Sequence, residues 1–422
     1  MKFPTLAALL LTGISAQASA TEVKQVVASK AYKATVAELD REHERIVGEI
    51  VKLTEIPAPP FKEKARGTAY AEMMRQAGLV DVEMDAEGNV TGLWRGTGPA
   101  GGPLIVIAAH QDTVFPEGTP VKVRREGTKL FAPGIGDDTR SLAVLLGYVR
   151  AMKAAGVQTG KDILFVGNVG EEGPGDLRGT RYLFGKSKYK GRIAAFFSMD
   201  GTDGSRIVNG GVGSKRYRVT FKGPGGHSYG AFGLVNPMAA MSQAVVDLYK
   251  VEVPKTPKTT YSASVTGGGT SVNSIPNEVF MEFDMRSVSA AELGKLDQRF
   301  QAIVKAAVDG ENHARSTREG TISADLKVIG ERPAGGTPAS SQIVRVAQQA
   351  IEAHGLKPEL NASSTDANVP MNLGIPAITI GSGGSGGRAH SLDEWIDIEK
   401  GASLKGMLPG LTMLLAMADL KN

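Results

Sequence analysis

Histidine and acidic side chains follow several short apolar runs of this sequence. His110 comes directly after the run Leu104 to Ala109, and Asp112 follows two residues later. In an extended segment, residues two apart face the same way. The Asp112 carboxylate can therefore orient the imidazole ring of His110.

Other acids and a second histidine occupy comparable places. They are Asp137 and Asp138 before a helix, Glu171 and Glu172 after the strand through Val166, Asp200 after the strand through Met199, and His390 beyond the strand that ends at Ile380. In an open α/β sheet, residues beyond the carboxyl ends of the strands converge on one crevice. Taken singly, each would more often be a packed histidine, a helix cap or a turn former. Their shared position favours a common site.

This set of side chains suits two zinc ions. Two histidines and three carboxylates can supply both shells if one carboxylate bridges the ions. Glu171 is then left over as a carrier of protons. The sequence contains no cysteine, so thiolate ligands are excluded and any metal must be held by histidine and carboxylate.

Composition restricts the partners. The formal net charge is +4 over 422 residues, and the basic residues are dispersed, with no nucleic-acid-binding motif among them. We therefore expect no nucleic acid partner. The first 20 residues combine Lys2, a short apolar run and Ala18-Ser19-Ala20, which is typical of a secretory signal peptide. We expect export to the periplasm or medium, and no membrane span after signal removal.

The apolar runs alternate with helical stretches, which indicates an α/β domain. Runs that are apolar at every position predict a mostly parallel sheet covered by helices on both faces. After residue 212 the pattern changes to β-α-β-β-α-β. We predict a catalytic domain formed by residues 21–212 and 331–422, interrupted by a small ferredoxin-like α+β domain over residues 213–330.

Six motifs occur in a characteristic order. They are His110-Gln-Asp112, Gly-Ile-Gly-Asp137-Asp138, Glu171-Glu172-Gly, Met199-Asp200-Gly, Gly-Gly-His227-Ser and Arg-Ala-His390-Ser. With them, the chain resembles the di-zinc peptidase family that includes peptidase T, dipeptidase V, carboxypeptidase G and the aminoacylases. The resemblance covers nearly all of the chain after residue 20. It implies a zinc-peptidase catalytic domain with a mixed, mostly parallel sheet and an inserted lid and dimerisation domain.

The resemblance also implies roles at the metal site. His110 and Asp200 would hold one zinc, Glu172 and His390 the other, and Asp137 would bridge them; cobalt or manganese are expected substitutes. Asp112 would support His110, Glu171 would be the general base, and the peptide bond after Asp137 is often cis in such proteins.

In the inserted domain, the resemblance gives His227 the role of stabilising the oxyanion, frequently across a homodimer. Asn273 and Arg286 would hold the substrate. In having an aspartate at position 200, the chain resembles the aminopeptidases and dipeptidases of the family. We therefore expect an aminopeptidase acting on di- and tripeptides. The alternatives are an N-acyl amino acid amidohydrolase or carboxypeptidase, and, in a different class, a non-catalytic metal- and peptide-binding envelope protein.

Overall fold

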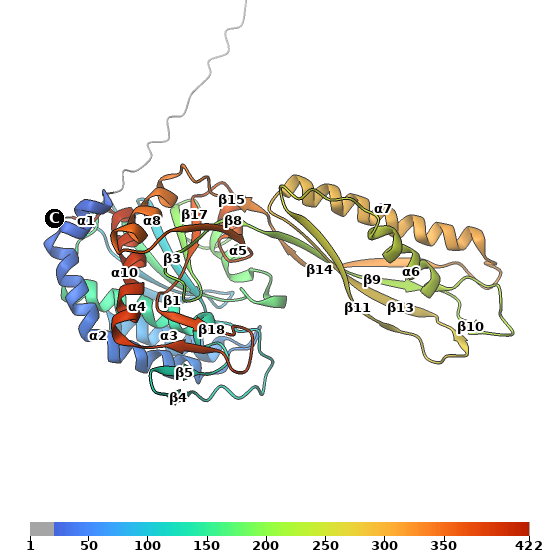
Figure 1. The fold of residues 1–422 in the computed structure, drawn as a ribbon, viewed down its shortest axis with the longest axis horizontal. Helices are drawn as coiled ribbons and strands as arrows, with labels where there is room; N and C mark the ends of the chain where they lie inside the picture. Colours follow the sequence, from blue (N-terminus) through green and yellow to red (C-terminus); the bar gives the residue numbers. More distant parts are fainter. Residues whose placement is uncertain (1–20, 422) are drawn as a thin grey trace, which may run out of the picture.

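A nine-stranded mixed sheet forms the centre of the main domain (Figure 1). The computed structural model describes residues 21–421. In spatial order the strands are β1 (Val80–Met84), β2 (Val90–Trp94), β6 (Asp162–Asn168), β3 (Leu104–His110), β7 (Ile193–Met199), β17 (Ala377–Ile380), β8 (Arg206–Gly211) and β15 (Gly335–Gly336), with β16 (Glu359–Ser363) also beside β8. Strands β6, β3, β7 and β17 run parallel to one another. The predicted mixed sheet is confirmed.

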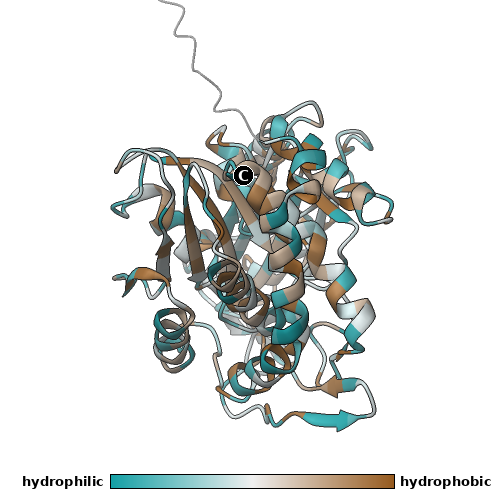
Figure 2. Cartoon of the chain, turned by 90° about the vertical axis from the view of Figure 1, so that its left-hand side faces the viewer, coloured by the Kyte–Doolittle hydropathy of each residue, from teal (hydrophilic) through white to brown (hydrophobic). Residues whose placement is uncertain are grey.

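Helices cover both faces of this sheet. One face carries α1 (Val23–Ala28), α2 (Lys30–Thr54), α3 (Lys64–Ala77), α4 (Arg140–Ala154), α8 (Gln342–Ala353) and α10 (Lys400–Met417), and the other carries α5 (Arg178–Gly185) and α9 (Asn368–Asn372). Successive strand residues point to opposite faces, so Ile107 packs in one apolar cluster and Val106 in the other. In the end-on view, the strands are largely brown, whereas the outer helices carry teal segments (Figure 2).

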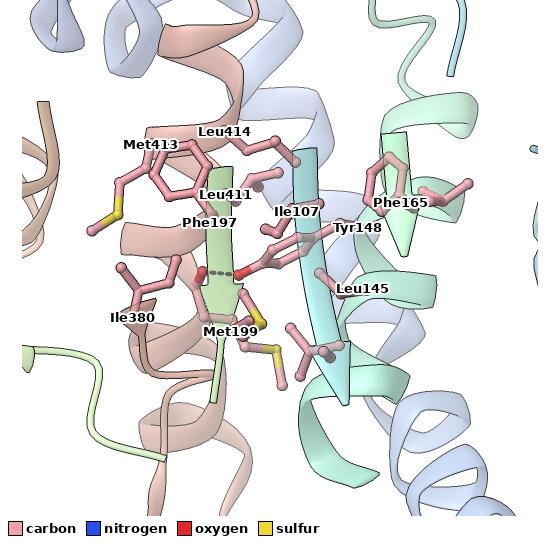
Figure 3. Packing of buried hydrophobic residues seen from close by; sticks show 14 of the residues in the cluster. Ile107, Leu145, Tyr148, Phe165, Phe197, Met199, Ile380, Leu411, Met413 and Leu414 are labelled. Atoms are coloured by element: carbon pink, nitrogen blue, oxygen red, sulfur yellow. Dashed lines mark hydrogen bonds between the residues drawn. The ribbon is translucent and has the colours of Figure 1, made fainter. Parts of the chain in front are cut away.

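The larger cluster joins α4 and α10 to the sheet (Figure 3). Tyr148 of α4 donates a hydrogen bond to the Met407 carbonyl of α10, and its ring lies among Ile107, Phe197 and Met199. Burial of these side chains fixes the strands whose carboxyl ends carry the polar residues described below. Among the described residues, no helix combines the length and the apolar character needed to cross a membrane.

A second sheet of four short strands was not predicted. It consists of β18 (Ser385–Gly387), β19 (Trp395–Asp397), β5 (Lys129–Phe131) and β4 (Arg124–Glu126), in that order. Three residues are too few to show a period of two. This sheet matters to the site because it places the segments before Asp137 and around His390 side by side.

The inserted domain, called the lid below, lies to one side of the main domain (Figure 1). Its antiparallel sheet has the order β11 (Thr259–Gly268), β13 (Glu278–Ser287), β9 (Gly213–Lys222) and β14 (Ser323–Arg332), and two helices, α6 (Pro237–Leu248) and α7 (Ala290–Ala314), share an apolar cluster with it. A small ribbon of β10 (Gly226–His227) and β12 (Ser274–Ile275) completes it. The predicted ferredoxin-like domain is confirmed.

The chain enters and leaves the lid at one place. Ser214 and Arg332 are paired neighbours on β9 and β14. The Asn368 side-chain amide donates to the carbonyls of both Val212 and Pro333, each at 2.9 Å. One side chain of the main domain therefore holds both connections. The predicted boundaries at 212/213 and 330/331 stay a prediction.

Candidate metal centre

Polar residues gather where the parallel strands end. His110 closes β3, Glu171 and Glu172 follow β6, and Asp200 follows β7. Asp137 lies in the short segment η1 (Ile135–Thr139), which precedes α4, and its own backbone is not helical. The loop after β18 brings His390 to the same edge. The structure therefore brings together residues up to 280 positions apart.

Asp137 lies between the two histidines. One of its oxygens is 2.9 Å from His110 Nε2, and the other is 3.2 Å from His390 Nε2. Glu172 Oε1 lies 3.0 Å from the same His390 nitrogen. The peptide bond between Asp137 and Asp138 is cis, as the resemblance implied.

Ligand atoms within 4.8 Å of one another form three overlapping groups. They are His110, Asp137 and Asp200; Asp137, Glu172 and His390; and His110, Glu171 and Glu172. The first two share Asp137 and together contain all five residues expected to bind metal. Imidazole nitrogens and carboxylate oxygens are the ligands that zinc takes in the absence of cysteine. The donor set therefore fits two divalent cations.

Charge repulsion among the acids also favours cations. Burial, together with the neighbouring Asp137, raises the pKa of Asp200 to about 7. Burial raises the pKa of Glu171 well above its ordinary value; Arg332 opposes this rise and Glu172 adds to it. Carboxylates crowded in this way are costly to ionise without a compensating positive charge. A bound divalent cation would supply that charge.

Asp112 holds the glutamate loop. Its carboxylate accepts backbone N–H bonds from Gly170, Glu171 and Glu172 at 2.9, 3.2 and 2.8 Å. His110 Nδ1 lies 3.0 Å from the Asp112 carbonyl oxygen but 3.7 Å from its carboxylate. The imidazole is therefore supported chiefly by the backbone carbonyl of Asp112. The side chain of Asp112 instead positions the loop that carries Glu171.

Glu394 holds the loop that carries Asp137, a role not predicted from the sequence. Its oxygens accept the N–H groups of Gly134, Gly136 and Asp137 at 2.9, 2.7 and 2.8 Å. Only 1% of its surface is exposed. Its place four residues after His390 is the one signal in the sequence that could have suggested this role.

Arg332, also not predicted, pairs with Glu171. The Arg332 guanidinium lies 2.9 Å from Glu171 Oε1 and also donates to the Glu171 carbonyl. Both side chains are buried. Arg332 is the last residue of lid strand β14, so the lid reaches the centre through this contact.

The lid residues expected at the site lie at opposite ends of the lid. Arg286 lines the same cavity as Glu171, Asp200 and His390. His227 and Asn273 lie at or beside the β10 and β12 ribbon, at the end of the lid far from the main domain (Figure 1). The ten-residue strands of the lid sheet span roughly 30 Å at about 3.4 Å per residue. Within one chain, the structure does not bring His227 to the metal centre, and its predicted role stays a prediction.

Known proteins of similar sequence or fold include a desuccinylase and peptidases. A succinyl-diaminopimelate desuccinylase from Polaromonas sp. is 26% identical over 331 residues, which are 74% of each protein. Aminopeptidase PepT from Bacillus cereus has a similar structure, with a TM-score of 0.70, 21% identity, and coverage of 89% of this chain and 99% of that one. The Bacillus subtilis YXEP protein, a dinuclear metal binding peptidase, matches with a TM-score of 0.64 and 15% identity over 89% of this chain and 99% of its own.

These relatives require one correction. The predicted export to the periplasm or medium is wrong, because relatives such as the desuccinylases and PepT are cytoplasmic enzymes. Residues 1–20, on which the signal-peptide prediction rested, lie outside the described residues. The expected homodimer stays a prediction.

The family model described as peptidase family M20/M25/M40 matches residues 106–418. This match includes the whole lid and extends into both parts of the main domain, beginning at residue 106 and ending at residue 418. It includes all five residues of the two overlapping groups that share Asp137. The predicted family and the predicted enzyme class are confirmed: the chain belongs to peptidase family M20/M25/M40, whose members are metal-dependent hydrolases with a dinuclear site.

Proposed function

We propose that this chain hydrolyses the amide bond of short peptides, as an aminopeptidase on di- and tripeptides, with two zinc ions and with Glu171 as general base. The observation that carries the proposal is the Asp137 carboxylate, which offers one oxygen to His110 and the other to His390, with the buried Glu171 beside them.

The overlapping groups support two ion positions. His110 and Asp200 would hold one zinc, Glu172 and His390 the other, and Asp137 both. When bound, the pair would lower the pKa of a shared water and polarise the carbonyl of the substrate. His110 can serve with Nε2 if its Nδ1 proton is donated to the Asp112 carbonyl.

Glu171 would move the proton. Its raised pKa brings the carboxylate closer to the range in which a group can both accept and return a proton near neutral pH. It would take a proton from the attacking water and deliver it to the nitrogen of the leaving amine. Arg332 and the Asp112-bound backbone hold this side chain and its loop in place. His227 would stabilise the oxyanion from the lid of a second chain.

The second candidate is the hydrolysis of an N-acyl amino acid or of a carboxy-terminal amide bond. Similarity to a succinyl-diaminopimelate desuccinylase supports it, whereas the likeness to aminopeptidase PepT shows a shared fold. Cleavage of Ala-Ala-Ala and of its N-acetylated form, measured by amine release with zinc and with a chelator, separates the two. Preference for the blocked peptide would favour the second candidate.

Glu171→Gln tests the base. We expect the variant to bind two zinc ions, measured by elemental analysis, and to lose several orders of magnitude in kcat. The control is Glu117→Gln, an exposed acid on the main domain, which should keep both. A near-normal rate in Glu171→Gln would exclude Glu171 as the base. If zinc-loaded wild-type protein binds peptides but releases no amine, the chain is a binding protein.

A further inference from the structure

Arginines surround the cavity at the metal centre. The cavity has a volume of about 440 Å³ and is lined by Glu171, Asp200 and His390 on the metal side. Four arginines line it as well: Arg206 of β8, Arg216 of β9, Arg286 of β13 and Arg332 of β14. Four acids, Asp137, Glu171, Glu172 and Asp200, line the metal side of the same cavity, where bound cations would offset their charge. The arginine side then suits an anionic group of a ligand.

Three of these arginines have acidic partners. Arg332 pairs with Glu171. Arg216 and Arg286 share the single carboxylate of Asp284, at 2.9 and 2.7 Å. This trio of Arg216, Arg286 and Asp284 therefore carries a net charge of +1.

Arg206 differs from the others. Within residues 21–421, no hydrogen bond or ion pair is formed by its guanidinium, although its side chain is half-buried. It lines a second cavity of about 290 Å³ as well, together with Asp200 and Thr202. Arg206 acts electrostatically on Asp200, whose charge a bound cation would offset. The guanidinium thus lies between two cavities with its hydrogen-bonding capacity unused.

The backbone holds Arg206 rigidly. It begins strand β8, where it pairs with Glu359 of β16, and its N–H donates to the Asp203 carbonyl. The next residue, Ile207, is fully buried and pairs with Ile380 of β17. A side chain on such a support can serve as a fixed point for recognition.

We propose that Arg206 binds a carboxylate of the substrate at a distance from the scissile bond, and that the site therefore selects amides with a free carboxylate. This inference rests on the proposed function. A guanidinium binds a carboxylate through two parallel N–H bonds. The residual charge of the Arg216, Asp284 and Arg286 trio gives the same preference. A short peptide with an unblocked carboxyl terminus meets this requirement, and a carboxy-terminal amide does not.

The test compares Ala-Ala-Ala with Ala-Ala-Ala-amide as substrates of the zinc-loaded protein. We expect the wild type to prefer the free acid. In Arg206→Gln, KM for the free acid should rise roughly ten- to a hundredfold, the range expected for a lost charge-assisted hydrogen bond. Its kcat and its KM for the amide should change little. Arg206→Lys keeps the charge but not the paired N–H geometry, so it should recover part of the loss.

The control is Arg218→Gln. Arg218 lies on β9, two residues from Arg216, and pairs with Glu282 outside the cavity. It should leave both KM values unchanged. If the wild type cleaves acid and amide equally well, or if Arg206→Gln raises both KM values alike, the inference is wrong while the proposed function stands.

A binding measurement distinguishes failure of the proposed peptide hydrolysis from failure of the inference about Arg206. If no peptide is cleaved, the proposed function fails, and calorimetric titration with N-acetylglycine still tests Arg206. We expect weaker binding by Arg206→Gln than by wild type or Arg218→Gln, and the neutral N-acetylglycinamide should not distinguish the three proteins. Equal binding of N-acetylglycine would overturn the inference.

Discussion

Replacing Glu394 by glutamine perturbs the loop that carries the bridging aspartate. The two Glu394 oxygens accept three backbone N–H bonds, two at Oε1 and one at Oε2. Glutamine has nearly the same shape, but its amide nitrogen is a donor. At least one buried N–H group would therefore face another donor instead of an acceptor.

The structure gives the size of the effect. A buried donor left without a partner costs about 1–3 kcal/mol, so we expect Glu394→Gln to lower the free energy of unfolding by about that amount. Alanine would leave three donors unpaired and cost about 3–9 kcal/mol, much of the roughly 5–15 kcal/mol that stabilises a domain. Glutamine is therefore the variant that should still fold.

The effect should depend on pH. Burial, with Asp137 adding to it, raises the pKa of Glu394 to about 7, while the three N–H bonds oppose the rise. This folded pKa lies above the unfolded value of about 4.3, so the folded wild type binds more protons than the unfolded chain between these values and loses stability as pH rises toward 7. The glutamine variant lacks this titrating group, so the difference in stability between the two proteins should be smaller at pH 8 than at pH 6.

Urea unfolding of chelator-treated protein at both pH values measures this difference, and zinc titration shows whether the loop still presents Asp137. The control is Asp393→Asn, because Asp393 is the exposed neighbour that pairs with Arg388. A stability at pH 6 within about 0.5 kcal/mol of wild type, the scatter usual for surface changes, with unchanged zinc affinity, would refute the reasoning.

Three further predictions concern the same centre and its connection to the lid. In chelator-treated protein, Asp200 has a folded pKa of about 7, above its unfolded value of about 3.9. The folded state then binds more protons between these values, so stability should fall by at most about 4 kcal/mol as pH rises from 4 to 7, and urea unfolding at pH 5 and 7 with and without zinc tests the sign. Arg332→Gln removes the cation that opposes the raised pKa of Glu171, so the acid limb of the kcat/KM profile should move to higher pH; an unmoved limb would exclude this coupling. Asn368→Leu leaves the two connecting carbonyls unpaired and should destabilise the main domain by about 2–6 kcal/mol, which a thermal melt unchanged from wild type would contradict.

The sequence predicted those parts of the site that have a local signal. His110, Glu172 and Asp200 each follow an apolar run, so the end of a strand could be located without knowledge of its partners. The roles of Glu394 and Arg332 could not be found in this way, because their contacts lie 257 and 161 residues away. Apart from the place of Glu394 four residues after His390, nothing local distinguishes them from surface residues.

The lid shows the same limit. Its order of elements was clear because strands of ten residues and two helices have readable periods. How far His227 lies from the metal centre could not be predicted, because that distance depends on how the lid sheet is joined to the main domain. The sheet formed by β18, β19, β5 and β4 was missed because its strands are too short for a pattern.

The paired ends of the lid have a consequence for the order of folding. The main domain is completed by residues after 330, which must return to strands formed before residue 212, and closing such a long gap costs chain entropy. Pairing of β9 with β14 places Ser214 and Arg332 opposite each other, about 5 Å apart. Once the lid has formed, the two parts of the main domain are joined as closely as if a short turn connected them. We therefore expect the amides of β9 and β14 to gain protection from hydrogen exchange before those of β17 during refolding, and the reverse order would show that the main domain closes without help from the lid.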